Sequence, residues 1–282
     1  MAILNFADEH NQVAYLQKSN EKSGPVFHQI VDFLNTTHIR YALTINPTIY
    51  VSHIKQFWNT IESITIEQGN THESVEALRA TVDGVTIDVT ESSLRRVLQL
   101  DDLNGIITLP NSEIFKNIAS MGYDTSDQKV TFRKGCFCPH WRFLIHTLLH
   151  CLSPKKTSYE QYGSTMAYLL VCLATDRTFN FSRFIFNNMK GNVKSSYKFL
   201  MYPRFVQAVL NEFPLQPHKR VYPTPCFKPK VFQNMCKASE LWNGEVKPLF
   251  PDMLSKVSQV QGEDATIPVV SHHTPSIVVP SI

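Results

Sequence analysis

The stretch Ala80-Thr81-Val82-Asp83-Gly84-Val85-Thr86-Ile87-Asp88-Val89 alternates apolar and polar side chains on both sides of Asp83-Gly84. An Asp-Gly pair between two alternating runs favours a two-residue hairpin turn, because both positions of that turn need positive φ. The stretch predicts a β-hairpin over 80–89. Most of the remaining pattern is helical, so this hairpin is the feature that distinguishes the predicted fold from an all-helical one.

Apolar residues recur at helical spacing on both sides of the hairpin. Several expected helices carry start or stop signals, which are Pro25, Thr90, Asn111, Asn180 and Pro203 as starts and Gly122 and Gly191 as stops. The pattern predicts helices over residues 25–36, 48–61, 91–98, 112–121, 139–152, 158–175, 180–190 and 203–213. A further short strand is expected at 129–132. The predicted fold class is therefore α+β, mainly α with a small β-hairpin element.

Composition divides the chain into three parts. Residues 1–24 are polar and weakly periodic, which predicts a loose N-terminal arm. Residues 25–213 are expected to form a helix-rich domain. Ten of the 16 prolines fall in residues 214–282, so this part is expected to be a Pro-rich, largely flexible tail with one helix at 230–243.

The sequence offers no targeting or membrane signal. The first residues lack a basic region followed by an apolar run, so no signal peptide is expected. The most apolar stretch, 165–174, is about half of the ~20 residues that span a bilayer. We expect the six cysteines to be reduced thiols. Together these features predict an intracellular protein, cytoplasmic or nuclear, without a membrane partner.

Charge is distributed unevenly along the chain. Residues 1–127 carry 8 Lys or Arg against 16 Asp or Glu, whereas residues 128–230 carry 16 against 3. Aromatic residues are interleaved with the cations of the second segment, a mixture that suits phosphate contacts and base stacking. Two interpretations stay open. The basic segment 128–230 binds nucleic acid, or it meets the acidic half of the same protein or of another copy.

The nucleic-acid interpretation nominates specific side chains. The expected phosphate contacts are cations of the basic segment: Arg133, Lys134, Arg142, Lys155, Lys156, Arg183, Lys194, Lys198 and Arg204. Tyr197 and Phe199 are candidates for base stacking, although core packing is the favoured role for both.

One cluster has the residue types of a zinc site. Cys136 and Cys138 precede a predicted helix on which His146 and His150 lie four positions apart, hence on one face. Against zinc, a Cys-x-Cys spacing is unusual for closed zinc sites. Burial of hydrogen-bonded imidazoles explains the pattern equally well, and no cofactor is then required.

Signatures of catalysis are missing from the sequence. Kinase chemistry needs a Gly-rich loop or a Gly-Lys-Ser/Thr turn to hold phosphates, and neither is present. Cys151 follows His150 directly, but sequence neighbours do not establish a nucleophile and its base. The Asp101-Asp102 pair is expected in a solvated turn rather than as an acid/base dyad. We therefore expect a protein that is not an enzyme.

Five segments together resemble a family of plant transposon protein domains, encoded in or near long-terminal-repeat retroelements. They are Asn46-Pro47-Thr48-Ile49-Tyr50-Val51-Ser52-His53-Ile54-Lys55-Gln56-Phe57-Trp58, Val82-Asp83-Gly84 with Val89 to Leu100, Leu109 to Phe115, Trp141 to Thr147, and Phe179 to Phe205. The resemblance covers about residues 26–213. It implies a mobile-element origin and a mostly helical fold, and it carries over no catalytic residue.

Relatives of this kind are sometimes labelled xylulose kinase or synaptobrevin-like longin protein, and the residues support neither label. The expected function is that of a non-enzymatic accessory or structural protein of a plant retroelement, binding nucleic acid through residues 128–230. The alternative is a protein-interaction scaffold whose acidic and basic parts complement each other, with no role in nucleic-acid binding.

Overall fold

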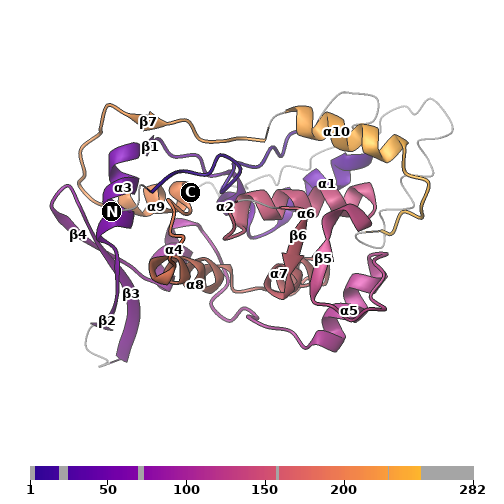
Figure 1. Cartoon of the computed structure of the whole chain (residues 1–282), viewed down its shortest axis with the longest axis horizontal. Coiled ribbons are helices and arrows are strands. Elements are labelled where there is room, and N and C mark those ends of the chain that lie inside the picture. Colours follow the sequence, from indigo (N-terminus) through magenta and orange to yellow (C-terminus); the bar gives the residue numbers. More distant parts are fainter. Residues whose placement is uncertain (1–3, 19–24, 69–72, 157–158, 228, 249–282) are drawn as a thin grey trace, which may run out of the picture.

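The computed structural model describes residues 4–18, 25–68, 73–156, 159–227 and 229–248. Helices and three small sheets share one hydrophobic core in this part, the α+β mixture that the sequence predicts (Figure 1). The helices are α1 (Pro25–Thr36), α2 (Arg40–Thr44), α3 (Val51–Thr60), α4 (Glu91–Val97), α5 (Asn111–Ser120), α6 (Pro139–Leu152), α7 (Ser164–Ala174), α8 (Phe181–Lys194), α9 (Pro203–Leu210) and α10 (Pro229–Glu240). The strands are β1 (Ile49–Tyr50), β2 (Glu62–Gln68), β3 (Glu73–Val82), β4 (Val85–Val89), β5 (Thr131–Arg133), β6 (Gln161–Gly163) and β7 (Val221–Tyr222).

The predicted hairpin is confirmed. β3 and β4 pair antiparallel with Val82 opposite Val85, and the two turn residues, Asp83 and Gly84, have φ of 48° and 79°. β2 pairs with the other edge of β3 and makes the sheet three-stranded, which was not predicted. Figure 1 shows this sheet at one end of the molecule, beside α3.

Local start signals place several helices where they were expected. α1 and α6 coincide with their predicted ranges. Thr90 and Ser93 form a reciprocal capping box at the start of α4, and the side chain of Asn180 accepts a hydrogen bond from the backbone N–H of Arg183 at the start of α8. Gly122, with φ of 89°, follows α5 as predicted.

Other boundaries differ from the prediction. Gly191 does not end α8, which continues to Lys194. The N-cap of α5 is Pro110 and not Asn111. The first part of the helix predicted at 158–175 contains the short strand β6, which pairs with β5, so that α7 begins only at Ser164. The short helix α2 was not predicted.

The N-terminal arm predicted as loose is packed into the fold over residues 4–18, so that prediction is wrong there. His10 and Asn11 are fully buried. The backbone N–H of Gln12 donates to the carbonyl of His150 at 3.0 Å, and that of Leu200 donates to the carbonyl of Asn5 at 3.1 Å. The arm is fixed because buried polar groups from distant parts of the chain use it as their hydrogen-bond partner.

The first part of the segment predicted to be a tail from residue 214 is also packed against the rest of the fold. β7 pairs with β1, and Val13 forms a bridge with Cys226. α10 confirms a helix near 230–243 and packs against α6 (Figure 1). Residues 249–282, predicted to be flexible, lie outside the described residues.

Among the described helices, none is long and apolar enough to cross a membrane. The cysteines that the structure describes are free thiols, as predicted: Cys136, Cys138, Cys151, Cys172 and Cys226. Burial raises the pKa of the Cys151 thiol to about 12, so this group is a protonated core residue and not a nucleophile.

Candidate functional site

Two constellations of polar side chains stand out from the core packing. The first is a surface groove beside α8, which we call the basic groove. Its volume is about 550 Å³. It is lined by Pro154, Lys155 and Lys156 after α6, by Asn187, Asn188, Gly191 and Asn192 of α8, and by Ser195, Tyr197, Phe199 and Met201 after α8.

Hydrogen bonds fix the backbone on both sides of the basic groove. The carbonyl of Lys155 accepts hydrogen bonds from the hydroxyl of Tyr159 at 2.7 Å and from Nδ1 of buried His10 at 2.9 Å. On the opposite side, the Asn192 amide donates to the carbonyl of Phe199 at 2.9 Å and accepts from its N–H at 3.3 Å. The side chains of the groove are therefore presented from a rigid frame.

The two aromatic residues of the basic groove differ in exposure. Tyr197 is 81% exposed, so the core-packing role favoured for it is wrong. Phe199 is 6% exposed and does pack in the core, and the Nζ atom of Lys156 lies 5.8 Å from the centre of its ring. Tyr197, Lys155 and Lys156 are all exposed, and all three line the basic groove.

The other nominated cations do not join this groove. Arg133 lines a separate depression together with Asp124 and Asp127. Arg142 donates to the carbonyl of Gly135 at 2.7 Å, and Arg183 lies 4.0 Å from the carboxylate of Glu91. Lys194 is exposed at the end of α8, while Lys198 is half-buried and its pKa is lowered by desolvation.

Two nominated cations are buried, and for them the predicted phosphate contact is wrong. The Nζ atom of Lys134 lies 3.3 Å from Nδ1 of His146 and 3.3 Å from the carboxylate of Glu160. Arg204 is 0% exposed and donates to the carbonyls of Asn11 and Ile45, both at 2.6 Å. A cation that is enclosed in the core cannot reach a phosphate in solution.

The predicted zinc cluster is not assembled. All four of its residues are described, yet no three of Cys136, Cys138, His146 and His150 offer ligand atoms within 4.8 Å of one another. Lys134 contacts His146, and burial together with the charges of His150 and Lys134 lowers the pKa of His146 to about 2. Burial of the two imidazoles, the alternative that the sequence left open, accounts for the spacing of His146 and His150.

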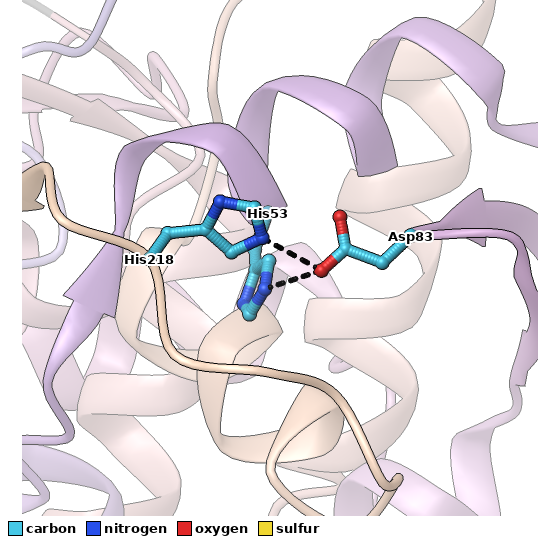
Figure 2. Close-up of side chains that lie close together, drawn as sticks. All are labelled: His53, Asp83 and His218. Carbon is cyan, nitrogen blue, oxygen red and sulfur yellow. Dashed lines mark hydrogen bonds and ion pairs between the residues drawn. The ribbon is translucent and has the colours of Figure 1, made fainter.

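The second constellation is formed by His53, Asp83 and His218, which we call the His–Asp–His cluster. Figure 2 shows that both imidazole rings face one carboxylate oxygen. Oδ2 of Asp83 lies 3.1 Å from Nε2 of His53 and 2.7 Å from Nε2 of His218. The three ligand atoms all lie within 4.8 Å of one another, and in the described part of the chain this is the one group of three such donors.

Three separate segments position the His–Asp–His cluster. His53 belongs to α3, and Asp83 is the first residue of the hairpin turn. His218 lies between α9 and β7, where the pairing of β7 with β1 holds it beside the start of α3. The side chains of His53, Asp83 and His218 are 2%, 24% and 36% exposed, so the cluster is enclosed on the side of His53 and open to solvent on the side of His218.

Gln56 orients the carboxylate of this cluster. Its amide donates to Oδ1 of Asp83 at 2.7 Å and accepts from the backbone N–H of Asp83 at 2.8 Å. The hydrogen bond from Gln56, and then those from His218 and His53, hold the pKa of Asp83 below its usual value. Asp83 is therefore a carboxylate with one oxygen fixed and the other shared by two imidazoles.

The sequence predicted Asp83 only as a turn residue, and it singled out neither histidine. His53 lies 30 positions from Asp83, and His218 lies 135 positions from it. No spacing rule connects residues so far apart, so no signal in the sequence could have shown that they meet.

The chain matches no protein-family model, no curated protein and no solved structure.

Proposed function

We propose that this protein is a non-enzymatic accessory or structural protein of plant retroelement origin, and that it binds single-stranded nucleic acid through the basic groove. The observation that carries the proposal is the gathering of Lys155, Lys156, Tyr197 and Phe199 around one groove. The resemblance to plant transposon protein domains supplies the proposed origin.

The groove has the two parts that sequence-tolerant binding of single strands requires. Ammonium groups attract the phosphate backbone, and an exposed aromatic ring offers a face on which a base can stack. The side-chain amides of Asn187 and Asn188 add hydrogen-bond donors and acceptors to the same surface.

The lysines of the groove retain their charge for a ligand. Lys155 and Lys156 form no ion pair in the part of the chain that the structure describes. Other cations of the basic segment are neutralised by acidic residues of the first half, since Arg177 pairs with Glu113 at 2.6 Å and Lys190 pairs with Glu76. Lys155 and Lys156 are therefore among the cations of the basic segment that have no acidic partner in the described residues.

A second depression adjoins the basic groove. Pro154, Lys155 and Asn188 line a second depression of about 250 Å³, which continues to the first turn of α7. The start of α7 has no side-chain cap, so its backbone N–H groups add a favourable potential for an anion. The two depressions share Pro154, Lys155 and Asn188 as lining residues, so a ligand in the basic groove would border on the second depression.

An electrophoretic shift series with a single-stranded oligonucleotide at increasing salt tests the proposal. We expect the double variant Lys155→Ala/Lys156→Ala to bind at least tenfold more weakly and to lower the salt slope by about 1.4, since each phosphate contact on a single strand contributes about 0.7. Tyr197→Ala should weaken binding by about 1–3 kcal/mol.

The matched control removes an equal charge elsewhere. Lys219→Ala/Arg220→Ala takes away two adjacent, exposed cations of the same basic segment that do not line the groove. This control should retain the affinity of the unaltered protein. Binding that does not depend on salt, no binding at low salt, or equal losses in both double variants would reject the proposal.

A protein-interaction scaffold is the second candidate, and the ion pairs between the two halves favour it. Glu76, Glu91 and Glu113 of the acidic half face Lys190, Arg183 and Arg177 of the basic half. If the same complementarity acts between copies, light scattering should show self-association at low salt that disappears at high salt. Monomers at both salt concentrations would reject this alternative.

A further inference from the structure

We propose that the His–Asp–His cluster is a binding site for one divalent metal ion of the zinc class. Nε2 of His53, Nε2 of His218 and Oδ2 of Asp83 would be its three protein ligands. Two imidazole nitrogens with one carboxylate oxygen are a ligand set that zinc and related metals accept, with water in the remaining position.

The arrangement of the donors supports the proposal. The two imidazoles approach the same carboxylate oxygen at 3.1 Å and 2.7 Å, and all three ligand atoms lie within 4.8 Å of one another. In a tetrahedral site with metal–ligand distances of about 2.0–2.1 Å, ligand atoms lie about 3.3 Å apart. The two oxygen–nitrogen separations would lengthen by about 0.2 Å and 0.6 Å, and the nitrogen–nitrogen separation, which is at most 4.8 Å, would settle near the same value. The side chain of His218, 36% exposed, has room at the surface for this adjustment.

The surroundings of the ligands support it as well. The reciprocal hydrogen bonds with Gln56 fix the carboxylate of Asp83, as outer hydrogen bonds orient the ligands of metal sites. His53 is 2% exposed at its side chain, and its ring meets that of His218 nearly at right angles, at 78° and 4.7 Å between centres. Solvent access from the side of His218 provides an entry path for the ion.

A metal ion at this position would join three segments that are distant in sequence. It would tie the hairpin turn and α3 to the chain between α9 and β7 (Figure 2). Because an ion that binds only the folded protein stabilises it, loading the site should raise the melting temperature. The site is thus proposed to stabilise the fold.

Calorimetric titration of the full chain with ZnCl₂, and visible spectroscopy with CoCl₂, test the proposal. The unaltered protein should bind one ion and give the d–d absorption bands of tetrahedral Co²⁺. The variants His218→Ala and Asp83→Asn should each bind at least tenfold more weakly and lose these bands. Asn is chosen at position 83 because it tolerates the positive φ of 48° found there.

Controls separate this site from other metal-binding residues. Cys136→Ser removes an exposed thiol of the zinc cluster predicted from sequence and should leave one-ion binding unchanged. Far-UV circular dichroism should show that His218→Ala is folded, since His218 is half-exposed. Absence of one-ion binding in the unaltered protein would overturn the proposal, as it would mean that the cluster is held by hydrogen bonds alone. Binding that survives His218→Ala but not Cys136→Ser would overturn it too.

Discussion

Arg204 is a buried cation that connects three segments of the chain. Its guanidinium donates to the carbonyls of Asn11, Ala42 and Ile45, and its charge is balanced by no carboxylate within 4.0 Å in the described part of the molecule. Desolvation lowers its pKa to about 10. The hydrogen bonds to backbone carbonyls compensate in part for the loss of water around the charge, since Nη2 of Arg204 is buried without a hydrogen-bond partner.

We expect Arg204→Ala to lower the free energy of unfolding by about 3–5 kcal/mol. The substitution leaves a cavity and removes the donor of two buried hydrogen bonds and one partly buried one, and hydrogen bonds to charged groups are each worth about 1.5–3 kcal/mol. Chemical denaturation measures the change. Arg220→Ala, which removes an exposed arginine, is the control and should change stability by less than about 0.5 kcal/mol. Equal effects of the two variants would contradict the role assigned to Arg204.

Buried histidines make stability depend on pH. Burial lowers the pKa of His10 to about 3, and it lowers the pKa of His140 and of His150 to about 4. An unfolded chain takes up these protons near pH 6.5, but the folded protein does not. Below pH 6.5 the unfolded state therefore binds more protons, and stability falls as the pH falls.

We expect the free energy of unfolding to be lower at pH 5.0 than at pH 7.5, with His10 alone contributing about 2 kcal/mol to the difference. Denaturation curves at both pH values measure this difference in the free energy of unfolding. In His10→Asn the difference should be smaller by about that amount, whatever the absolute stability of the variant. The same pH dependence with and without His10 would show that this imidazole is not buried in neutral form.

At the scale of elements, the hairpin turn shows how far local rules extend. Gly84 has φ of 79°, a conformation that costs other residues about 1–2 kcal/mol, whereas a Cβ atom added there would meet nothing within 4 Å. The cost of a substitution should therefore arise from the backbone alone.

Gly84→Ala should destabilise the protein by about 1 kcal/mol in a urea denaturation experiment. Gly135→Ala is the matched control, because its Cβ would also meet nothing within 4 Å and its φ is not in the left-handed region. The control should be neutral or slightly stabilising. A loss of similar size at both glycines would mean that the positive φ is not the cause.

For the molecule as a whole, residues 4–18 matter more than their polar composition suggests. His10 accepts a hydrogen bond from the backbone of Tyr202 at 2.9 Å, and Asn11 donates to the carbonyl of Cys151 at 2.9 Å. This segment thus satisfies buried groups at the end of α6 and just before the start of α9, which lie far apart in sequence.

Deletion of residues 1–18 should abolish cooperative unfolding, because it exposes the core, leaves these groups without partners and removes the Asn11 carbonyl from the guanidinium of Arg204. Thermal melts followed by circular dichroism at 222 nm measure the transition. A cooperative transition near that of the full chain after this deletion would contradict the structure of residues 4–18.

The sequence by itself determined the features that depend on neighbours a few positions apart. The Asp83-Gly84 turn, the capping box at Thr90, the cap at Asn180 and the start of α6 at Pro139 all follow from short-range hydrogen bonds and φ preferences. The step from an acidic to a basic half is likewise a property of composition alone.

Only the tertiary structure decided which cations face solvent. It also decided which histidine and aspartate side chains come together. Lys134 and Arg204 belong to the same basic segment as Lys155 and Lys156, yet the first two are buried and the last two line a groove. The His–Asp–His cluster arises because the pairing of β7 with β1 brings His218 to α3. Burial and long-range contact depend on how all elements pack together, and no local pattern in the sequence encodes that packing.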